Sequence, residues 1–165
     1  MKKNIFALTV LLAGLMTGMT AYAGDELKSN DVLQQEITLT RAALETQRKA
    51  VILQNIQLTT EEGSAFWPVY NHYRTEMQKV GDKRVAVIGD YADAYRNNAL
   101  SDKAAAKLLD RYLNVLQDQV KVKKKFVRKF KKVLPAIKVA RFYQVDNRLD
   151  LLVNMQIASG VPLME

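Results

Sequence analysis

The chain has 165 residues, of which 48% are hydrophobic, and it contains no Cys, one His, three Pro and seven Gly. This length suits one small domain and argues against a two-domain enzyme. Without Cys the protein can form no disulfide, no thiolate metal site and no cysteine nucleophile. Its 25 basic and 17 acidic residues give a net charge of +8, which favours anionic partners.

Residues 1–23 have the pattern of a secretory signal. Two lysines precede an apolar stretch from Ile5 to Thr20, and Ala21-Tyr22-Ala23 forms a small-x-small cleavage site. We therefore expect cleavage after Ala23 and a single helical domain over residues 24–165 in the periplasm or outside the cell. A retained membrane anchor fits less well, because the stretch is shorter than the roughly 20 apolar residues that a span needs.

Apolar residues recur at three-and-four spacing through most of residues 24–165, whereas strand-like alternation never persists. The pattern therefore predicts an all-α fold. The predicted helices cover about 31–53, 60–96, 102–134 and 136–157. Helices of over 30 residues reach roughly 50 Å, so we expect an elongated bundle of about four helices, dominated by a long antiparallel hairpin of the second and third.

The two long helices carry signals at their ends. Thr59 can cap the second helix while Glu62 reaches back to the backbone N–H of Thr59, which is the arrangement of a capping box. Ser101 is the expected cap of the third helix. Pro135 should end or bend that helix, since proline lacks a backbone donor and restricts the residue before it.

Each predicted helix has a stripe of residues expected to face inward. The first includes Leu33, Ile37, Leu44 and Val51. The second includes Phe66, Tyr70, Tyr73, Met77, Val80, Arg84, Val87, Tyr91 and Ala94. The third includes Ala105, Leu109, Tyr112, Leu116, Gln119, Lys123, Phe126, Phe130 and Val133, and the fourth includes Val139, Phe142, Val145, Leu149 and Leu152. Gly81 and Gly89 each weaken the second helix by about 1 kcal/mol relative to Ala, which leaves its continuity open.

Charged residues interrupt the stripes of the two long helices. In an antiparallel hairpin that turns near Ala99, the numbers of facing residues should add to roughly 199. Lys123 would then face Glu76, and Arg84 would lie within a turn of Asp118. Two interpretations remain open: the interruptions are paired charges that fix the register, or their long side chains reach water from the edge of the stripe.

The residue types argue against an enzyme. His72 is the only imidazole, so no catalytic triad can be built, and we assign no catalytic residue. His72 and Glu76, four residues apart, supply two metal ligands where zinc generally takes three or four. We therefore expect no metal in a monomer, although a dimer axis could double the ligand set. No glycine-rich loop follows a strand, and we expect no cofactor.

The most informative segment is residues 121–141, which contain ten basic residues and no acidic one. Helical geometry separates its apolar side chains from seven cations on the opposite arc, with Lys123 as the exception. We call these cations the basic face: Lys121, Lys124, Lys125, Arg128, Lys129, Lys131 and Lys132. The face is either a solvated outer surface or a collecting surface for anionic proteins, lipid headgroups or envelope polymers. Since an exported protein rarely meets nucleic acid, we expect no nucleic-acid partner.

An aromatic cluster covers residues 66–73. Its spacing matches the inward stripe of the second helix, which favours a core position for most of its members. Trp67 lies off that stripe beside Pro68. Trp67 is therefore a candidate for an exposed apolar contact with a partner.

Two helix starts carry related motifs, Leu58-Thr59-Thr60-Glu61-Glu62 and, 42 residues later, Leu100-Ser101-Asp102-Lys103-Ala104. They resemble the Leu-Thr-x-x-Gln motifs of the Spy and CpxP group of periplasmic stress proteins. The segment 134–145 also looks like a helix of exported relatives that are grouped with periplasmic metal sensors.

The resemblance implies a thin, curved helical homodimer whose cationic, partly apolar concave face holds unfolded envelope proteins without ATP, or which damps a membrane sensor kinase. Two alternatives remain. One is a structural or membrane-associated protein that rests its basic face on anionic lipid, and the other is a metal-responsive sensor subunit.

Overall fold

A computed structural model describes the backbone of residues 30–164 and the side chains of residues 40–164. The predicted signal, residues 1–23, and its cleavage site lie outside this range. Four helices make up the described chain, and it contains no strand, so the all-α prediction is confirmed. They are α2 (Asn30–Ile56), α3 (Thr60–Arg96), α4 (Asp102–Phe130) and α5 (Ala136–Gly160).

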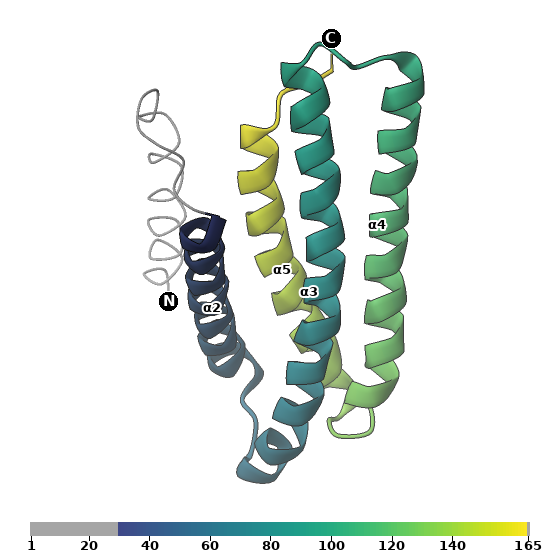
Figure 1. Cartoon of the computed structure of the whole chain (residues 1–165). Coiled ribbons are helices and arrows are strands. Elements are labelled where there is room, and N and C mark those ends of the chain that lie inside the picture. The colour runs from purple at the N-terminus through teal and green to yellow at the C-terminus, as the bar shows by residue number, and fades with distance from the viewer. Residues whose placement is uncertain (1–29, 165) are drawn as a thin grey trace.

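The helices form an elongated bundle of two closely packed pairs. α3 packs along α4, and α2 packs along α5. Figure 1 shows α3 and α4 as an antiparallel hairpin joined at the end of the bundle where the C-terminus lies, with α2 leading into α3 at the opposite end. The predicted dominance of a long hairpin is therefore confirmed.

Both starts of the hairpin helices are capped as predicted. The backbone N–H of Glu62 donates to Thr59 Oγ1 over 3.2 Å, and the backbone N–H of Thr59 donates to Glu62 Oε2 over 2.9 Å. The hydroxyl of Ser101 accepts from the backbone N–H of Ala104 over 3.3 Å. These bonds satisfy donors that have no partner within the helix, and they explain why the predicted starts at 60 and 102 are correct.

α4 ends at Phe130, four residues earlier than predicted. Residues 131–134 form turns that lead into Pro135, which stands just before α5. Proline disfavours helical geometry at the residue before it, so the helix unwinds ahead of the proline instead of reaching it. α2 and α5 run three residues further than predicted at their C-terminal ends, to Ile56 and Gly160.

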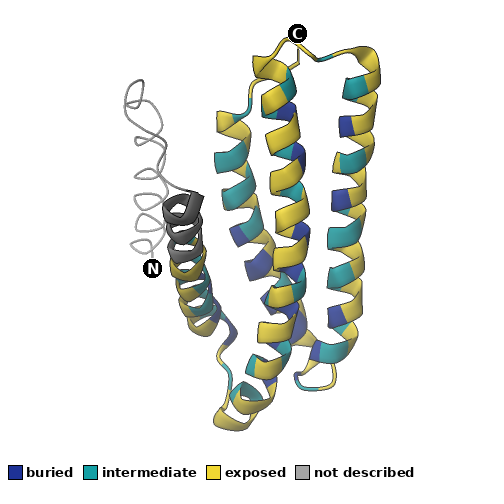
Figure 2. Ribbon diagram, in the orientation of Figure 1, coloured by how far each residue is buried: buried dark blue, intermediate teal, exposed yellow. Residues whose placement is uncertain are grey.

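The core is aromatic at the end of the bundle where α2 meets α3. Figure 2 shows that buried residues lie on the faces that the helices turn toward one another. We call the six fully buried aromatic residues of this region the aromatic core: Phe66, Tyr70, Tyr73, Phe126, Phe130 and Phe142. Ring centroids of Phe130 and Phe142 lie 4.6 Å apart, the closest of these pairs. Burial of such rings is the main force that holds the four helices together.

The predicted inward stripe of α3 is confirmed for its apolar members from Phe66 to Tyr91, and that of α5 for Val139 through Leu149. Leu152 was expected inside, but it is 42% exposed. On α2 the buried apolar residues are Ile52 and Ile56, whereas the predicted Leu44 and Val51 are half-buried. The predicted Leu33 and Ile37 lie outside the described side chains.

The stripe of α4 is correct only in its second half. Phe126 and Phe130 are buried as predicted, but near the start of the helix the buried residues are Leu108 and Val115. The expected Leu109 and Tyr112 are 56% and 46% exposed. Here α4 turns Leu108 and Val115 toward Val80, Val87 and Tyr91 of α3, and the other edge of its apolar stripe stays uncovered.

Three ion pairs between α3 and α4 fix the register of the hairpin. Successive pairs are seven residues apart on both helices, and the two numbers of every pair add to 201, close to the predicted 199. The pairs are Glu76 with Lys125 at 3.8 Å, Lys83 with Asp118 at 2.6 Å, and Asp90 with Arg111. A spacing of seven returns to the same face of a helix, so the pairs form a ladder along one side of the hairpin.

The predicted pairing of Lys123 with Glu76 is wrong, because Lys125 takes that position. Arg84 lies within a turn of Asp118 as expected, and its Nη2 donates to Gln119 over 3.2 Å. Lys123 and Arg84 both reach across to α5 instead of forming the hairpin ladder. Both charged residues are therefore partnered, Lys123 by α5 and Arg84 by α4 and α5.

α3 runs without a break through Gly81 and Gly89. Both glycines are exposed, and a Cβ at either position would meet no atom within 4 Å. Gly81→Ala and Gly89→Ala should each raise the free energy of unfolding by about 1 kcal/mol, because Ala loses less backbone entropy than Gly on forming a helix. Urea unfolding followed by circular dichroism measures the change. A loss of stability in either variant would contradict this account.

Candidate functional site

The basic face lies on the half of α4 that leads toward α5 and on the turn that follows this helix. Six of its seven cations are exposed, and Lys129 is half-buried. The Nζ of Lys129 lies 4.7 Å from the ring centroid of Phe126, so a cation–π contact holds this side chain against the aromatic core. The structure therefore leaves the basic face in solvent, as the separation of apolar and basic arcs predicts.

Few carboxylates approach the basic face. Lys121 lies 3.7 Å from Asp118, and Lys125 lies 3.8 Å from Glu76. Such long, exposed pairs contribute little to stability and leave the cations free to bind elsewhere. Five cations have no carboxylate oxygen within 4.0 Å anywhere in residues 40–164: Lys124, Arg128, Lys129, Lys131 and Lys132. Most of the positive charge of the face is thus uncompensated.

Lys123 points into the bundle and joins a group of buried charges. Asp146 is fully buried, and it accepts hydrogen bonds from Arg48 Nη1 over 2.8 Å and from the Tyr73 hydroxyl over 2.6 Å. Asp150 accepts from Arg48 Nη2 over 3.0 Å and from Lys123 Nζ over 2.9 Å. We call these five residues the central ion network. They come from all four described helices, so the network fixes α4 with its basic face outward.

The two carboxylates of the network differ in their pKa values. Burial, and then the negative charge of Asp150, raises the pKa of Asp146. Burial also opposes ionisation of Asp150, but the cations Arg48 and Lys123 outweigh it and hold the pKa of Asp150 below its ordinary value. Two cations face two carboxyl groups, so the network is neutral when both are ionised.

Sequence reasoning missed Arg48, Asp146 and Asp150. A signal was present, since Asp146 and Asp150 are one helical turn apart and flank Leu149 of the predicted inward stripe. Two acids on the apolar face of one helix indicate buried partners. The pattern does not say which cations supply them, because those come from α2 and α4.

His72 and Glu76, the two side chains considered as metal ligands, each contact other residues. The ring of His72 packs edge-on against Phe126, with centroids 5.1 Å apart. Glu76 bonds Lys79 over 2.7 Å and approaches Lys125. Within the described residues, no three His, Asp or Glu side chains lie close enough together to hold a metal ion.

The structure places Trp67 at the edge of the aromatic core. Its ring is half-buried and packs edge-on against Phe66 and Tyr70, with centroids 5.1 and 5.3 Å apart. The residue that instead offers an apolar surface at this end of the bundle is Ile137, which is 78% exposed. Sequence reasoning missed Ile137 because it lies just after Pro135, outside any stripe.

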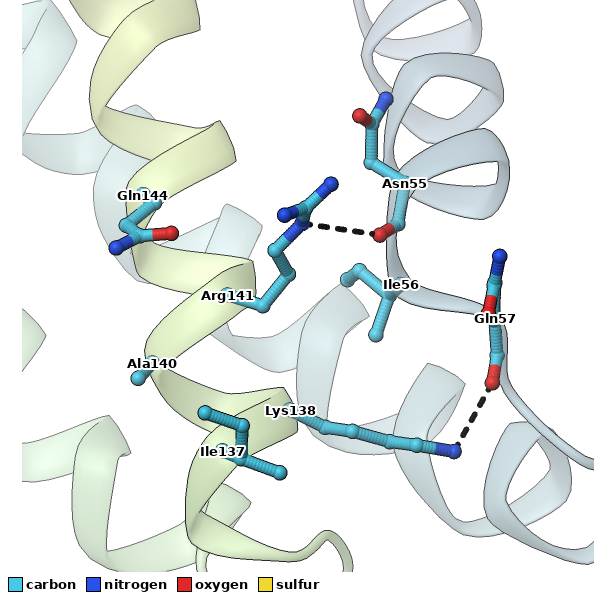
Figure 3. Close-up of a pocket in the computed structure, with 8 residues that line it drawn as sticks. All are labelled: Asn55, Ile56, Gln57, Ile137, Lys138, Ala140, Arg141 and Gln144. Carbon is cyan, nitrogen blue, oxygen red and sulfur yellow. Dashed lines mark hydrogen bonds between the residues drawn. The ribbon is translucent and has the colours of Figure 1, made fainter.

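Two further cations of the basic segment cap α2. Figure 3 shows Lys138 and Arg141 of α5 reaching toward the end of α2 across a cavity of about 440 Å³. Arg141 Nε donates to the carbonyl of Asn55 over 3.3 Å, and Lys138 Nζ donates to the carbonyl of Gln57 over 2.9 Å. Cations stabilise the carbonyl end of a helix, so these two have a structural role.

None of the four described helices combines the length and the hydropathy that a membrane crossing requires. The chain matches no protein-family model, no curated protein and no solved structure. The resemblance to the Spy and CpxP group therefore stays a prediction. The function is therefore inferred from the geometry of the basic face.

Proposed function

We propose that this protein is an exported, non-enzymatic binding protein that holds unfolded or anionic envelope proteins, as an ATP-independent chaperone or a modulator of envelope stress responses. The observation that carries the proposal is the exposure of the basic face, with five cations that have no carboxylate partner in residues 40–164. A fixed cluster of like charges steers anionic chains toward it and raises their rate of association.

Apolar surface adjoins these cations. Val120 precedes the basic face on α4 and is 50% exposed, and Ile137 follows it at the start of α5. Unfolded proteins expose both charged and apolar groups, so a surface with both kinds of contact suits them better than one with charge alone. Exposed charges are screened by salt, which makes the electrostatic part of such binding salt-dependent.

The triple variant Lys124→Glu, Arg128→Glu and Lys131→Glu should bind and protect an acidic unfolded client far less well than the unaltered protein. Aggregation of the client, followed by light scattering at low and high salt, is the measurement. The matched control reverses Lys103, Lys107 and Arg148, which are exposed cations outside the basic face. Both variants change the net charge by the same amount, so only position distinguishes them.

Equal suppression by the unaltered protein and the triple variant would refute the proposal, as would no suppression at either salt concentration. The same proteins should be floated with vesicles. Binding to anionic but not neutral vesicles, without protection of a client, would assign the basic face to a membrane surface instead.

A further inference from the structure

A second cavity opens at the end of the bundle opposite the basic face. Its volume is about 650 Å³, and it lies among α3, α4, α5 and the C-terminal segment after α5. Figure 1 shows this end as the one where α3 passes into α4 and where the chain ends. Its lining is aliphatic and aromatic except for Arg84 and Asn154, and we call it the apolar groove.

Small side chains leave the apolar groove open. Ala105 and Ala106 of α4 and Ala158 of α5 line it, where larger residues would close the space. Leu109 and Tyr112, which sequence reasoning places in the core, also line it and stay half in solvent. Apolar surface gathered in a concave site of this volume is typical of ligand-binding sites.

The C-terminal segment forms one wall of the groove. The hydroxyl of Tyr91 donates to the carbonyl of Pro162 over 2.9 Å, and Leu163 and Met164 extend along the lining. This bond ties an otherwise exposed segment to α3. A ligand in the groove would therefore contact both fixed helices and a segment held by one hydrogen bond.

Arg84 brings a positive charge to this apolar site. Its guanidinium donates to the side-chain oxygens of Asn154 and Gln119, which are both neutral amides. Its Nε is buried and has no hydrogen-bond partner, and no carboxylate in residues 40–164 lies within 4.0 Å of the guanidinium. Arg48 and Lys123, by contrast, bond the carboxylates of the central ion network.

A partly buried cation without an anion is costly, and a carboxylate is its strongest hydrogen-bonding partner. The charge therefore selects a ligand with an acidic group, while the rest of the lining selects an apolar body. The side-chain amide of Asn154 also lines the groove, and it can donate to a second carboxylate oxygen. A linear amphiphile with a carboxylate head group and an apolar chain combines the acidic group and the apolar body that this lining selects.

We propose that the apolar groove binds a single-chain fatty carboxylate, with its carboxylate at Arg84 and Asn154 and its alkyl chain between Leu109 and Tyr112 of α4 and Ile157 of α5. This site is independent of the basic face and of the proposed function. It gives the protein a small-molecule ligand in addition to its macromolecular partners.

Isothermal titration of the purified protein with dodecanoate, below its micelle concentration, tests the proposal. We expect saturable binding of one dodecanoate per chain. Dodecanol, which has the chain without the charge, should bind at least about tenfold more weakly, and butanoate, which has the charge without the chain, should not bind measurably. Absence of saturable dodecanoate binding, or equal affinity for dodecanoate and dodecanol, would overturn the proposal.

Variants locate the site. Arg84→Gln should bind dodecanoate and dodecanol equally, whereas Arg84→Lys should keep the preference for dodecanoate. Ala105→Phe should fill the groove and abolish binding of both ligands, while the matched control Ala140→Phe, at the cavity of Figure 3, should bind like the unaltered protein. Full binding by Ala105→Phe would refute the site even if Arg84→Gln failed to fold. Loss of binding in the triple variant of the basic face would also refute it, because it would place the ligand there.

Discussion

Asp146→Ala should lower the free energy of unfolding by about 3–5 kcal/mol, as removal of one partner from a buried ion pair typically does. The side chain is fully buried and joins α5 to Arg48 of α2 and Tyr73 of α3. Without it, two cations of the central ion network face the single carboxylate of Asp150. The Tyr73 hydroxyl also loses its acceptor, and a buried donor without a partner is costly.

Urea unfolding of Asp146→Ala beside the unaltered protein measures this loss. Asp90→Ala is the control, because it removes the exposed pair with Arg111, and we expect it to cost less than about 1 kcal/mol. A cost for Asp146→Ala as small as that of Asp90→Ala would show that the central ion network does not hold the helices together.

Stability should fall steeply in alkali. Tyr70 and Tyr73 are fully buried, and their hydroxyls donate to the carboxylates of Glu45 over 2.7 Å and Asp146 over 2.6 Å. Burial raises the pKa of both tyrosines well above the ordinary value near 10, and the neighbouring carboxylates raise it further. In the folded protein both hydroxyls therefore keep their protons at a pH where the unfolded chain has lost them.

The sign of the effect follows from this difference. The stability that depends on the protonated tyrosines is fully present below pH 10 and is lost as the pH rises above it, since only the unfolded chain then releases protons. Each tyrosine contributes a slope of about 1.4 kcal/mol per pH unit, so the two together give roughly 3 kcal/mol per pH unit.

Urea unfolding across this alkaline range measures the slope. Tyr70→Phe and Tyr73→Phe should each reduce it by about one half of the combined value, whereas Tyr95→Phe, at a position 37% exposed, should leave it unchanged. An unchanged slope in Tyr73→Phe would mean that this hydroxyl ionises in the folded protein, against the contact with Asp146.

The central ion network and the basic face are linked through one side chain. Among the cations of residues 121–132, Lys123 is the one that turns inward to Asp150. Its bond fixes the rotation of α4 about its own axis, so that its neighbours Lys124 and Lys125 are held in solvent. A buried charge pair of this kind specifies orientation more than it adds stability. Binding by the basic face thus depends on a contact made inside the bundle.

The sequence by itself determined the local structure of this protein. The capping box of Thr59 and Glu62, the serine cap of Ser101 and the break before Pro135 set the helix ends, because each involves only residues within one or two turns. The amphipathic period of α4 likewise separated the basic face from the apolar side, since the angle between neighbouring side chains is a property of the helix alone.

Only the tertiary structure decided which partners the inward residues meet. Lys123 pairs with Asp150 and not with Glu76, because α5 lies beside the hairpin at this position. Leu109 lines the apolar groove and not the core, because α5 leaves space beside the hairpin there. Among the described side chains, none compensates the charge of Arg84, because its nearest partners on α4 and α5 are amides. Helical periodicity fixes the direction in which a side chain points from the axis of its helix. The charge or the open space that the side chain meets there depends on the packing of residues distant in sequence.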